Sequence, residues 1–218
     1  MRRLRSTTLV GALREDLETI VDRDPSIGSL SEAMLHPALP AVWAYRVANP
    51  LHPRGRRRLA WAVAQLGKIV SGGVEIHTGA AIGRRFFIDH GAGVVIGETA
   101  EIGDDVTFFH QVTLGSAGWW HDQEEGARRH PRIGNRVVIG ANATVLGPIS
   151  TGDECTIGAQ ALVLDDVPSR SRVLAPASQV REARSKTGGD NVTVLRSSRA
   201  PGGTHSASRS VAAAFPVW

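Results

Sequence analysis

His90 is the side chain of this sequence that best suits proton transfer. It directly follows Asp89, and Glu75 stands 15 residues earlier. A carboxylate beside an imidazole fixes the tautomer of the ring and raises its basicity, as in a Ser-His-Asp site without the serine. The substrate would then supply the hydroxyl group. The spacing also fits a second reading, in which Glu75 and His90 are unrelated surface residues.

A second group of polar residues, Arg128, Arg129 and His130, directly precedes Pro131. A guanidinium group binds a carboxylate through two parallel hydrogen bonds, so an arginine here could hold an acidic substrate. The alternative is a basic patch on a solvated loop.

The other histidines and the single cysteine carry weaker signals. His77, His110 and His121 stand apart, and no closely spaced histidine pair suggests the convergent ligands of a zinc site. We therefore expect no metal. Cys155 falls on a small, inward position of the repeat described next, which predicts a core residue and not a nucleophile.

From about residue 70 the sequence repeats every six residues, and this repeat must position the polar groups. The lead positions, of which 13 of 14 are apolar, are Val70, Ile76, Ile82, Ile88, Ile96, Ile102, Phe108, Leu114, Ile133, Ile139, Val145, Thr151, Ile157 and Val163. Glycine follows the lead in eight hexads, and the fifth position is mostly small or β-branched. A period of six predicts a short strand and a corner in each hexad. Three hexads make a triangular coil, so we expect a β-helix of between four and five coils.

The repeat is interrupted twice, and loops that leave a rigid scaffold often carry function. The first break spans residues 89–95 and contains His90. The second lies between Leu114 and Ile133 and ends in Arg129 and His130. Its adjacent rings, Trp119 and Trp120, could close over a substrate. A surface insertion without a role is the alternative.

The segments on either side of the repeat differ from it in kind. Residues 1–69 show apolar residues at helical spacing, broken by Asp-Pro, His-Pro and Asn-Pro pairs, which predicts a small helical domain. Residues 70–182 form the predicted β-helix domain. Residues 183–218 are rich in Ser, Gly, Arg and Thr without a period, which predicts a disordered tail.

Composition excludes several classes of protein. One cysteine in 218 residues rules out an internal disulfide framework, and no apolar stretch reaches the length of a membrane span. The apolar run from Leu9 to Leu13 is too short for a signal peptide, so we expect a cytoplasmic protein. The net charge of +4 would permit nucleic-acid binding, but no recognition motif accompanies the basic runs, which favours solvated surface.

Several motifs together resemble the serine O-acetyltransferases of cysteine biosynthesis. They are the runs FFIDHG, GVVIGETA, VTLG and RRHPRIG, with HPALPAVWAYR upstream. The similarity covers roughly residues 12–170 and is closest to the short bacterial form. It implies a left-handed parallel β-helix, mainly β, with a small N-terminal helical domain. It also implies a homotrimer, or a dimer of trimers, with active sites between subunits.

The resemblance also assigns roles to individual positions. His90 matches the general base, Glu75 its acidic partner, and His130 a second active-site histidine. The expected substrates are acetyl-CoA and L-serine, with no tightly bound cofactor. Asp24 and Asp89 match residues that hold the ammonium group of the amino acid, and Arg129 matches its carboxylate clamp. The positions expected at the coenzyme A site are Ala141, Ala159 and Gly115.

Some positions depart from the family pattern, and they surround the substrates. Thr78 stands where the family usually has proline, and the loop after Gly115 is about five residues longer. Trp218 ends the chain where partners of cysteine synthase typically have isoleucine, so we do not expect that complex. Two other functions stay open: O-acetylation of another hydroxy amino acid such as homoserine, and a non-catalytic β-helix that serves as a binding subunit.

Overall fold

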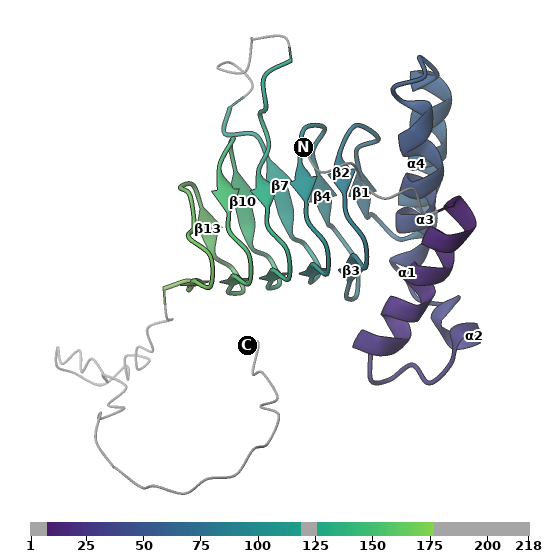
Figure 1. Ribbon diagram of the computed structural model, residues 1–218, viewed down its shortest axis with the longest axis horizontal. Coiled ribbons are helices and arrows are strands. Elements are labelled where there is room, and N and C mark those ends of the chain that lie inside the picture. The colour runs from purple at the N-terminus through teal and green to yellow at the C-terminus, as the bar shows by residue number, and fades with distance from the viewer. Residues whose placement is uncertain (1–7, 119–125, 177–218) are drawn as a thin grey trace, which may run out of the picture. The chain divides into compact units, whose positions relative to one another are not determined.

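The computed structural model describes residues 8–118 and 126–176, in which helices precede a stack of short strands (Figure 1). The helices are α1 (Leu9–Arg23), α2 (Leu30–Ala33), α3 (Leu39–Ala48), the 3-10 helix η1 (Asn49–Leu51) and α4 (Arg57–Val70). The strands are β1 (Glu75–Ile76), β2 (Ala81–Ile82), β3 (Phe87–Ile88), β4 (Val95–Ile96), β5 (Glu101–Ile102), β6 (Thr107–Phe108), β7 (Thr113–Gly115), β8 (Arg132–Ile133), β9 (Val138–Ile139), β10 (Thr144–Leu146), β11 (Ser150–Thr151), β12 (Thr156–Ile157), β13 (Leu162–Val163) and β14 (Arg172–Val173).

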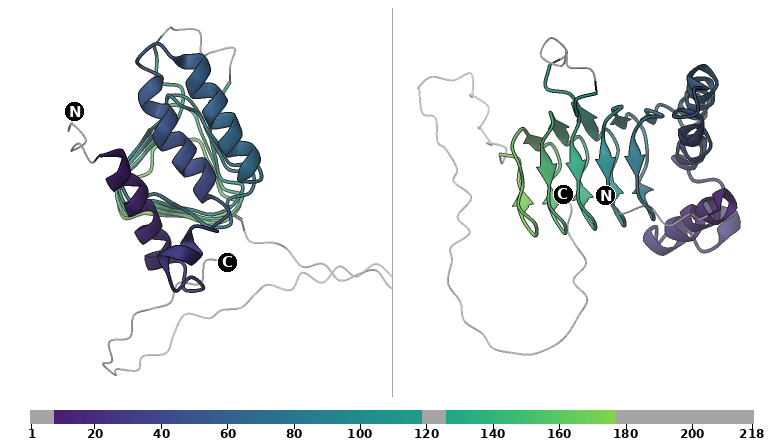
Figure 2. Two further views of the ribbon diagram at one scale, coloured as in Figure 1. Left: turned by 90° about the vertical axis from the view of Figure 1, so that its right-hand side faces the viewer. Right: turned by 45° about the horizontal axis from the view of Figure 1, so that its top comes forward.

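The strands form three parallel sheets that make the sides of a triangular coil (Figure 2). The first sheet has the order β1-β4-β7-β10-β13, the second β2-β5-β8-β11, and the third β3-β6-β9-β12-β14. Each strand from β1 to β10 pairs with the strand three later, one coil away, whereas β12 pairs with β14, because the intervening residue Val167 makes only an isolated bridge to Thr151. This arrangement confirms the predicted parallel β-helix.

The residues at the lead positions of the hexads are buried, as the repeat predicts. Lead residues such as Ile96, Phe108 and Ile139 are at most 1% exposed, and Cys155 is buried among them as predicted. Val70 is the exception, because it ends helix α4 and is 62% exposed. The prediction that Val70 leads the first hexad is therefore wrong, and the coils begin with β1.

Coil length changes at the first predicted break. Ala81 pairs with Glu101, 20 residues on, whereas Val95 pairs with Thr113, 18 residues on. The two extra residues lie in the corner 89–94, where His90 adopts a left-handed backbone conformation with φ +61°. The same left-handed conformation recurs at Gln111, Asn142 and Gln160 in the regular corners, so the break distinguishes the corner of His90 by its length.

Three corners join the sheets, and two of them carry the predicted site. The first corner joins the first sheet to the second and includes residues 77–80, 97–100 and 126–131. The third corner joins the third sheet back to the first and includes residues 89–94, 109–112, 140–143 and 158–161.

Ion pairs fasten the helices to the second corner, which joins the second sheet to the third and includes residues 83–86 and 103–106. The Arg46 guanidinium binds Asp16 of α1 and also donates to the carbonyl groups of Ile82 and Gly83. Arg23, at the end of α1, donates to Asp105 at 3.0 Å. These contacts fix the end of α1, and with it Asp24, against the β-helix.

Helices α3 and α4 pack closely because a glycine lies between them. A Cβ atom on Gly67 would lie 2.4 Å from the Cβ of Ala44, so no larger residue fits. The predicted helical spacing of α4 is confirmed, but its apolar residues Leu59 and Leu66 are 51% and 63% exposed. The buried face of α4 is lined by Ala60 and Gly67 instead.

The described helices include none that is long and apolar enough to cross a membrane. The described residues 8–118 and 126–175 belong to one compact unit, which contains both the helices and the β-helix. The predicted tail, 183–218, and the loop residues Trp119 and Trp120 lie outside the described residues.

Candidate active site

Four polar residues meet at the third corner: the predicted Asp24, Asp89 and His90, and His36, which was not predicted. Asp24 follows α1, His36 precedes α3, and Asp89 and His90 follow β3. They line a pocket of about 420 Å³. One ligand atom each from Asp24, His36 and Asp89 lies within 4.8 Å of the others. The structure therefore brings Asp24 to Asp89 and His90 across more than 60 positions of sequence.

His90 is held loosely in this pocket. Its side chain is 69% exposed, and its Nε2 lies 3.7 Å from Asp89 Oδ1, too far for a normal hydrogen bond. The ring of His110, one coil further along the third corner, packs edge-on at 5.8 Å between centroids. His110 Nδ1 is buried and has no hydrogen-bond partner within the described residues.

The charges of the pocket suit a cation. Hydrogen bonding from the Ser26 hydroxyl is the main cause that lowers the pKa of Asp24, which keeps this carboxylate ionised. Burial lowers the pKa of His36, so its imidazole stays neutral. The carboxylates of Asp24 and Asp89 beside a neutral imidazole, with Glu32 also lining the pocket, can bind an ammonium group or a metal ion. The expectation that no metal binds stays a prediction.

Thr99 organises the first corner. Its Oγ1 accepts the backbone N–H groups of Arg129 at 2.8 Å and His130 at 3.0 Å. The backbone N–H of Thr99 donates to His130 Nδ1 at 3.2 Å, and the threonine hydroxyl lies 2.9 Å from the same nitrogen. A ring nitrogen that accepts an N–H carries no proton, so the neutral ring of His130 is protonated on Nε2.

Glu98 and Gly97 complete this corner. The Glu98 carboxylate accepts from Arg129 at 2.7 Å and is also reached by Arg57 of α4 at 3.5 Å. A Cβ atom on Gly97 would lie 2.0 Å from the ring of His130, so the imidazole packs directly on the glycine backbone. Only glycine fits beneath this ring.

Glu75 is engaged elsewhere within the chain. It begins β1 in the first sheet, one coil below Val95, and its carboxylate forms an ion pair with Lys68 of α4. Among the described residues, the carboxylate that pairs with His90 is Asp89. The structure thus does not bring Glu75 into contact with His90, and its role as acidic partner stays a prediction.

The three positions expected at the coenzyme A site divide between the corners. Ala141 and Ala159 stack on the third corner, where the N–H of Gln160 donates to the carbonyl of Ala141 at 2.8 Å. Gly115 ends β7 at the first corner, and its carbonyl accepts from Gly147 at 3.0 Å.

Comparison with known proteins decides the family. No family model matches the sequence. The chain is 47% identical over 173 residues to the serine acetyltransferase of Mycobacterium tuberculosis, covering 79% of this chain and 73% of that protein. It is 49% identical over 160 residues to the serine acetyltransferase of Helicobacter pylori, covering 73% and 90%. The chain belongs to the serine acetyltransferase family.

A solved member of this serine acetyltransferase family has the same fold. The isoform 3 enzyme of Entamoeba histolytica, in complex with cysteine, matches with a TM-score of 0.72 at 33% identity. The match covers 81% of this chain but 62% of the other, so this chain spans less than two thirds of that solved chain. The predicted left-handed β-helix behind N-terminal helices is confirmed, as is the predicted serine O-acetyltransferase enzyme class.

The departure at Thr78 has a local structural reason in this serine acetyltransferase. The hydroxyl group of Thr78 lies 2.8 Å from His52 Nδ1, and its carbonyl accepts from the side-chain amide of Asn49 at 2.9 Å. A proline could not form the first bond. The substitution therefore ties the end of η1 to the first coil.

Sequence reasoning missed His36, Glu98 and Thr99 as site residues. His36 lies in the HPALP run, and Glu98 and Thr99 lie in the GETA run, and both runs entered only as motifs of the family resemblance. The sequence could have pointed to Glu98 and Thr99, because the six-residue repeat places them at a corner one coil away from His77. The same corner receives Arg129 and His130 at the end of the long loop between Leu114 and Ile133.

Proposed function

We propose that this enzyme transfers the acetyl group of acetyl-CoA to the hydroxyl group of L-serine, with His90 as the general base. The observation that carries this proposal is the convergence of Asp24, Asp89 and His90 in one pocket. Two carboxylates there suit an ammonium group, and an exposed imidazole beside them can reach a nearby hydroxyl.

Arg129 would bind the serine carboxylate, and this requirement supports an assembly. Arg129 lies at the first corner, whereas His90 lies at the third corner of the same chain. If the first corner of one subunit faces the third corner of the next, both groups reach one substrate. We therefore propose a homotrimer with acceptor sites between subunits, and sedimentation or light scattering of the purified protein would measure its mass.

In the proposed reaction His90 takes the proton of the serine hydroxyl as the oxygen attacks the thioester carbonyl. The C–O bond forms, the C–S bond breaks, and the departing thiolate of coenzyme A takes the proton from the imidazolium. His130, protonated on Nε2, would donate to the developing oxyanion. No covalent enzyme intermediate or metal is required.

Glu75 would assist His90 only after a change of partner. Its carboxylate is bound by Lys68 in this chain, so an active dyad requires that Glu75 exchange Lys68 for the imidazole. Backbone groups at Ala141, Ala159 and Gly115 would bind acetyl-CoA along the coil edges. A cytoplasmic location fits this substrate, and a complex with cysteine synthase is not part of the proposal.

The test is thiol release from acetyl-CoA with L-serine, L-homoserine and L-threonine as acceptors. We expect kcat/KM to be highest for L-serine. Higher kcat/KM with L-homoserine would move the function to the alternative acceptor. No thiol release with any acceptor, from folded protein that binds acetyl-CoA, would favour a non-catalytic binding subunit.

A further inference from the structure

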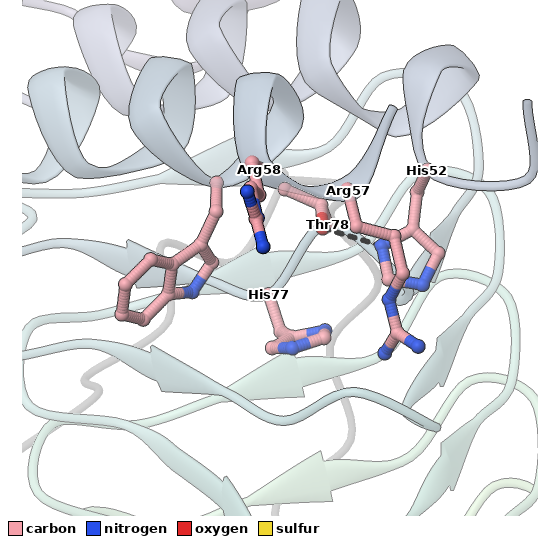
Figure 3. A pocket seen from close by; sticks show the side chains of 6 residues that line it. His52, Arg57, Arg58, His77 and Thr78 are labelled. Carbon is pink, nitrogen blue, oxygen red and sulfur yellow. Dashed lines mark hydrogen bonds between the residues drawn. The ribbon is translucent and has the colours of Figure 1, made fainter. Parts of the chain in front are cut away.

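A separate pocket lies where the helices meet the first corner of the β-helix (Figure 3). Its volume is about 260 Å³. The residues that line it are His52, Arg57, Arg58, Trp61, His77 and Thr78. Figure 3 shows Arg58 extending from α4 toward His77, with Arg57 and His52 at the other end of the pocket.

The lining of this pocket is cationic and contains no carboxylate. Arg58 has no ion pair or hydrogen bond within the described residues, unlike Arg46, Arg85 and Arg136, which all bind carboxylates. Arg57 is 69% exposed, and its one carboxylate contact, with Glu98, is at the hydrogen-bond limit of 3.5 Å. Two weakly neutralised guanidinium groups beside one hollow attract an anion.

The other lining groups add a flat surface and hydrogen-bond donors. Trp61 is 60% exposed and follows Arg58 by three positions, so the two side chains share one face of α4. His77 Nδ1 accepts the N–H of Gly79 at 3.1 Å, so the neutral ring carries its proton on Nε2 as a donor. His52 is fixed through Thr78.

We propose that this pocket binds a small phosphate monoester of a planar ring, with the phosphate on Arg57 and Arg58 and the ring on Trp61. A phosphate offers three acceptor oxygens, which matches two guanidinium forks and an imidazole donor better than a carboxylate does. An exposed indole provides the stacking surface for the ring.

The pocket is linked to the proposed acceptor clamp through one carboxylate. Glu98 is shared by Arg57, which lines the pocket, and Arg129, which the proposed function assigns to the serine carboxylate. An anion that draws Arg57 away leaves Glu98 to Arg129 alone. The clamp then binds the substrate carboxylate less readily, so occupancy of the pocket raises the KM for serine. This link, unlike the binding itself, rests on the proposed function.

Binding is tested by calorimetry on the full-length protein with phenyl phosphate as the probe. Phenol supplies the ring without the anion, and inorganic phosphate supplies the anion without the ring. We expect phenyl phosphate to bind at least tenfold more tightly than either one. Phenyl phosphate binding no tighter than inorganic phosphate would overturn the ring site, and no binding of any probe would overturn the pocket.

Two variants with the same charge change locate the binding. Arg58→Gln should weaken phenyl phosphate at least tenfold, whereas Arg172→Gln on β14, at the far end of the coils, should leave the Kd within twofold. Equal effects of the two variants would show non-specific charge attraction and overturn the site. Saturating acetyl-CoA should not displace the probe, and displacement would place it in the donor site instead.

The link to catalysis has its own readout. Phenyl phosphate should raise the KM for serine about three- to tenfold, leave the KM for acetyl-CoA unchanged, and lose its effect in Arg58→Gln. Binding without a change in the serine KM would overturn the link while the pocket stands. If the wild-type protein shows no acetyltransferase activity without phenyl phosphate, the proposed function is contradicted. The pocket would still stand, because calorimetric binding of phenyl phosphate does not depend on activity.

Discussion

The third and first corners of the β-helix hold their polar side chains in opposite ways. At the third corner His90 is 69% exposed and lies 3.7 Å from its nearest carboxylate. At the first corner Arg129 and His130 are fixed by four hydrogen bonds to Thr99 and one to Glu98. One corner leaves its imidazole accessible, whereas the other holds a guanidinium group and an imidazole in place.

This difference suits two distinct tasks. A general base must reach a proton that arrives with the substrate, so an open pocket with few internal bonds serves it. A clamp must present a guanidinium fork at a defined position, so it needs support from neighbouring residues. Neither corner combines both properties, which is the structural reason for proposing that corners of two subunits share each site.

The largest effect should come from the open corner. Replacing His90 with alanine removes the proposed base, so kcat should fall by about 100- to 10,000-fold. Acetyl-CoA should still bind, because docking of the thioester does not need the imidazole. Steady-state kinetics and calorimetry with acetyl-CoA measure the two quantities. A variant that keeps more than a tenth of the wild-type kcat would show that His90 is not the base.

The clamp should give the next largest effect. In Arg129→Lys an ammonium group replaces the planar fork, so kcat/KM for serine should fall by about 10- to 150-fold, which corresponds to roughly 1.5–3 kcal/mol. The KM for acetyl-CoA should not change. Arg132→Lys, which alters an exposed pair with Glu101, is the matched control and should be nearly silent. A rise in the acetyl-CoA KM instead would assign Arg129 to the donor site.

A third change tests whether the first corner depends on precise positions. Gly97→Ala places a methyl group 2.0 Å from the ring of His130, so the imidazole must move. We expect kcat to fall about 10- to 100-fold, since a shift of about 1 Å can cost that much. In Gly28→Ala the nearest atom is 3.6 Å away, so activity should be unchanged. Full activity of Gly97→Ala would show that His130 does not act from this position.

The fold was predictable because the hexad repeat determines which residues face inward. The predicted leads from Ile76 onward and the small fifth positions are buried, so the sequence sufficed for the coils. The prediction from the hexad repeat was wrong at Val70, an apolar residue six positions before Ile76 that ends helix α4. Periodicity alone does not separate the last turn of an amphipathic helix from the first hexad.

The site was less predictable because its groups come together through tertiary packing. Asp24 reaches the third corner only because ion pairs hold α1 against the coils, and no local pattern encodes that contact. Glu75 shows a contact that spacing could not indicate, since Lys68 on the preceding helix forms an ion pair with the carboxylate that spacing linked to His90, and the role of Glu75 stays a prediction. The family resemblance supplied Asp24, whereas spacing supplied Glu75 and His90.

The smallest predicted effect compares one imidazole at each corner, the buried ring of His36 and the half-buried ring of His77. Burial is the main cause that lowers the pKa of His36, beside the third corner, and of His77, at the first corner, below the ordinary 6.5. The unfolded chain therefore binds more protons than the folded chain as the pH falls below about 6.5, so stability is full above this value and decreases below it. We expect the Tm to drop between pH 7.5 and pH 5.5, with about 2 °C or less from each imidazole.

Single replacements separate the two contributions. His36→Gln and His77→Gln should each reduce the fall in Tm on acidification, because glutamine takes up no proton, whereas changes in Tm at pH 7.5 report only altered packing. Thermal melts of the three proteins at both pH values give the comparison. Asp24 and Asp89 favour a protonated His36 against His90, whereas Glu98 and Glu75 favour a protonated His77 against Arg57 and His52. A Tm that rises on acidification in the wild type, but not in His36→Gln, would show that the carboxylates of the third corner outweigh burial and that its pocket carries more negative charge than its geometry indicates.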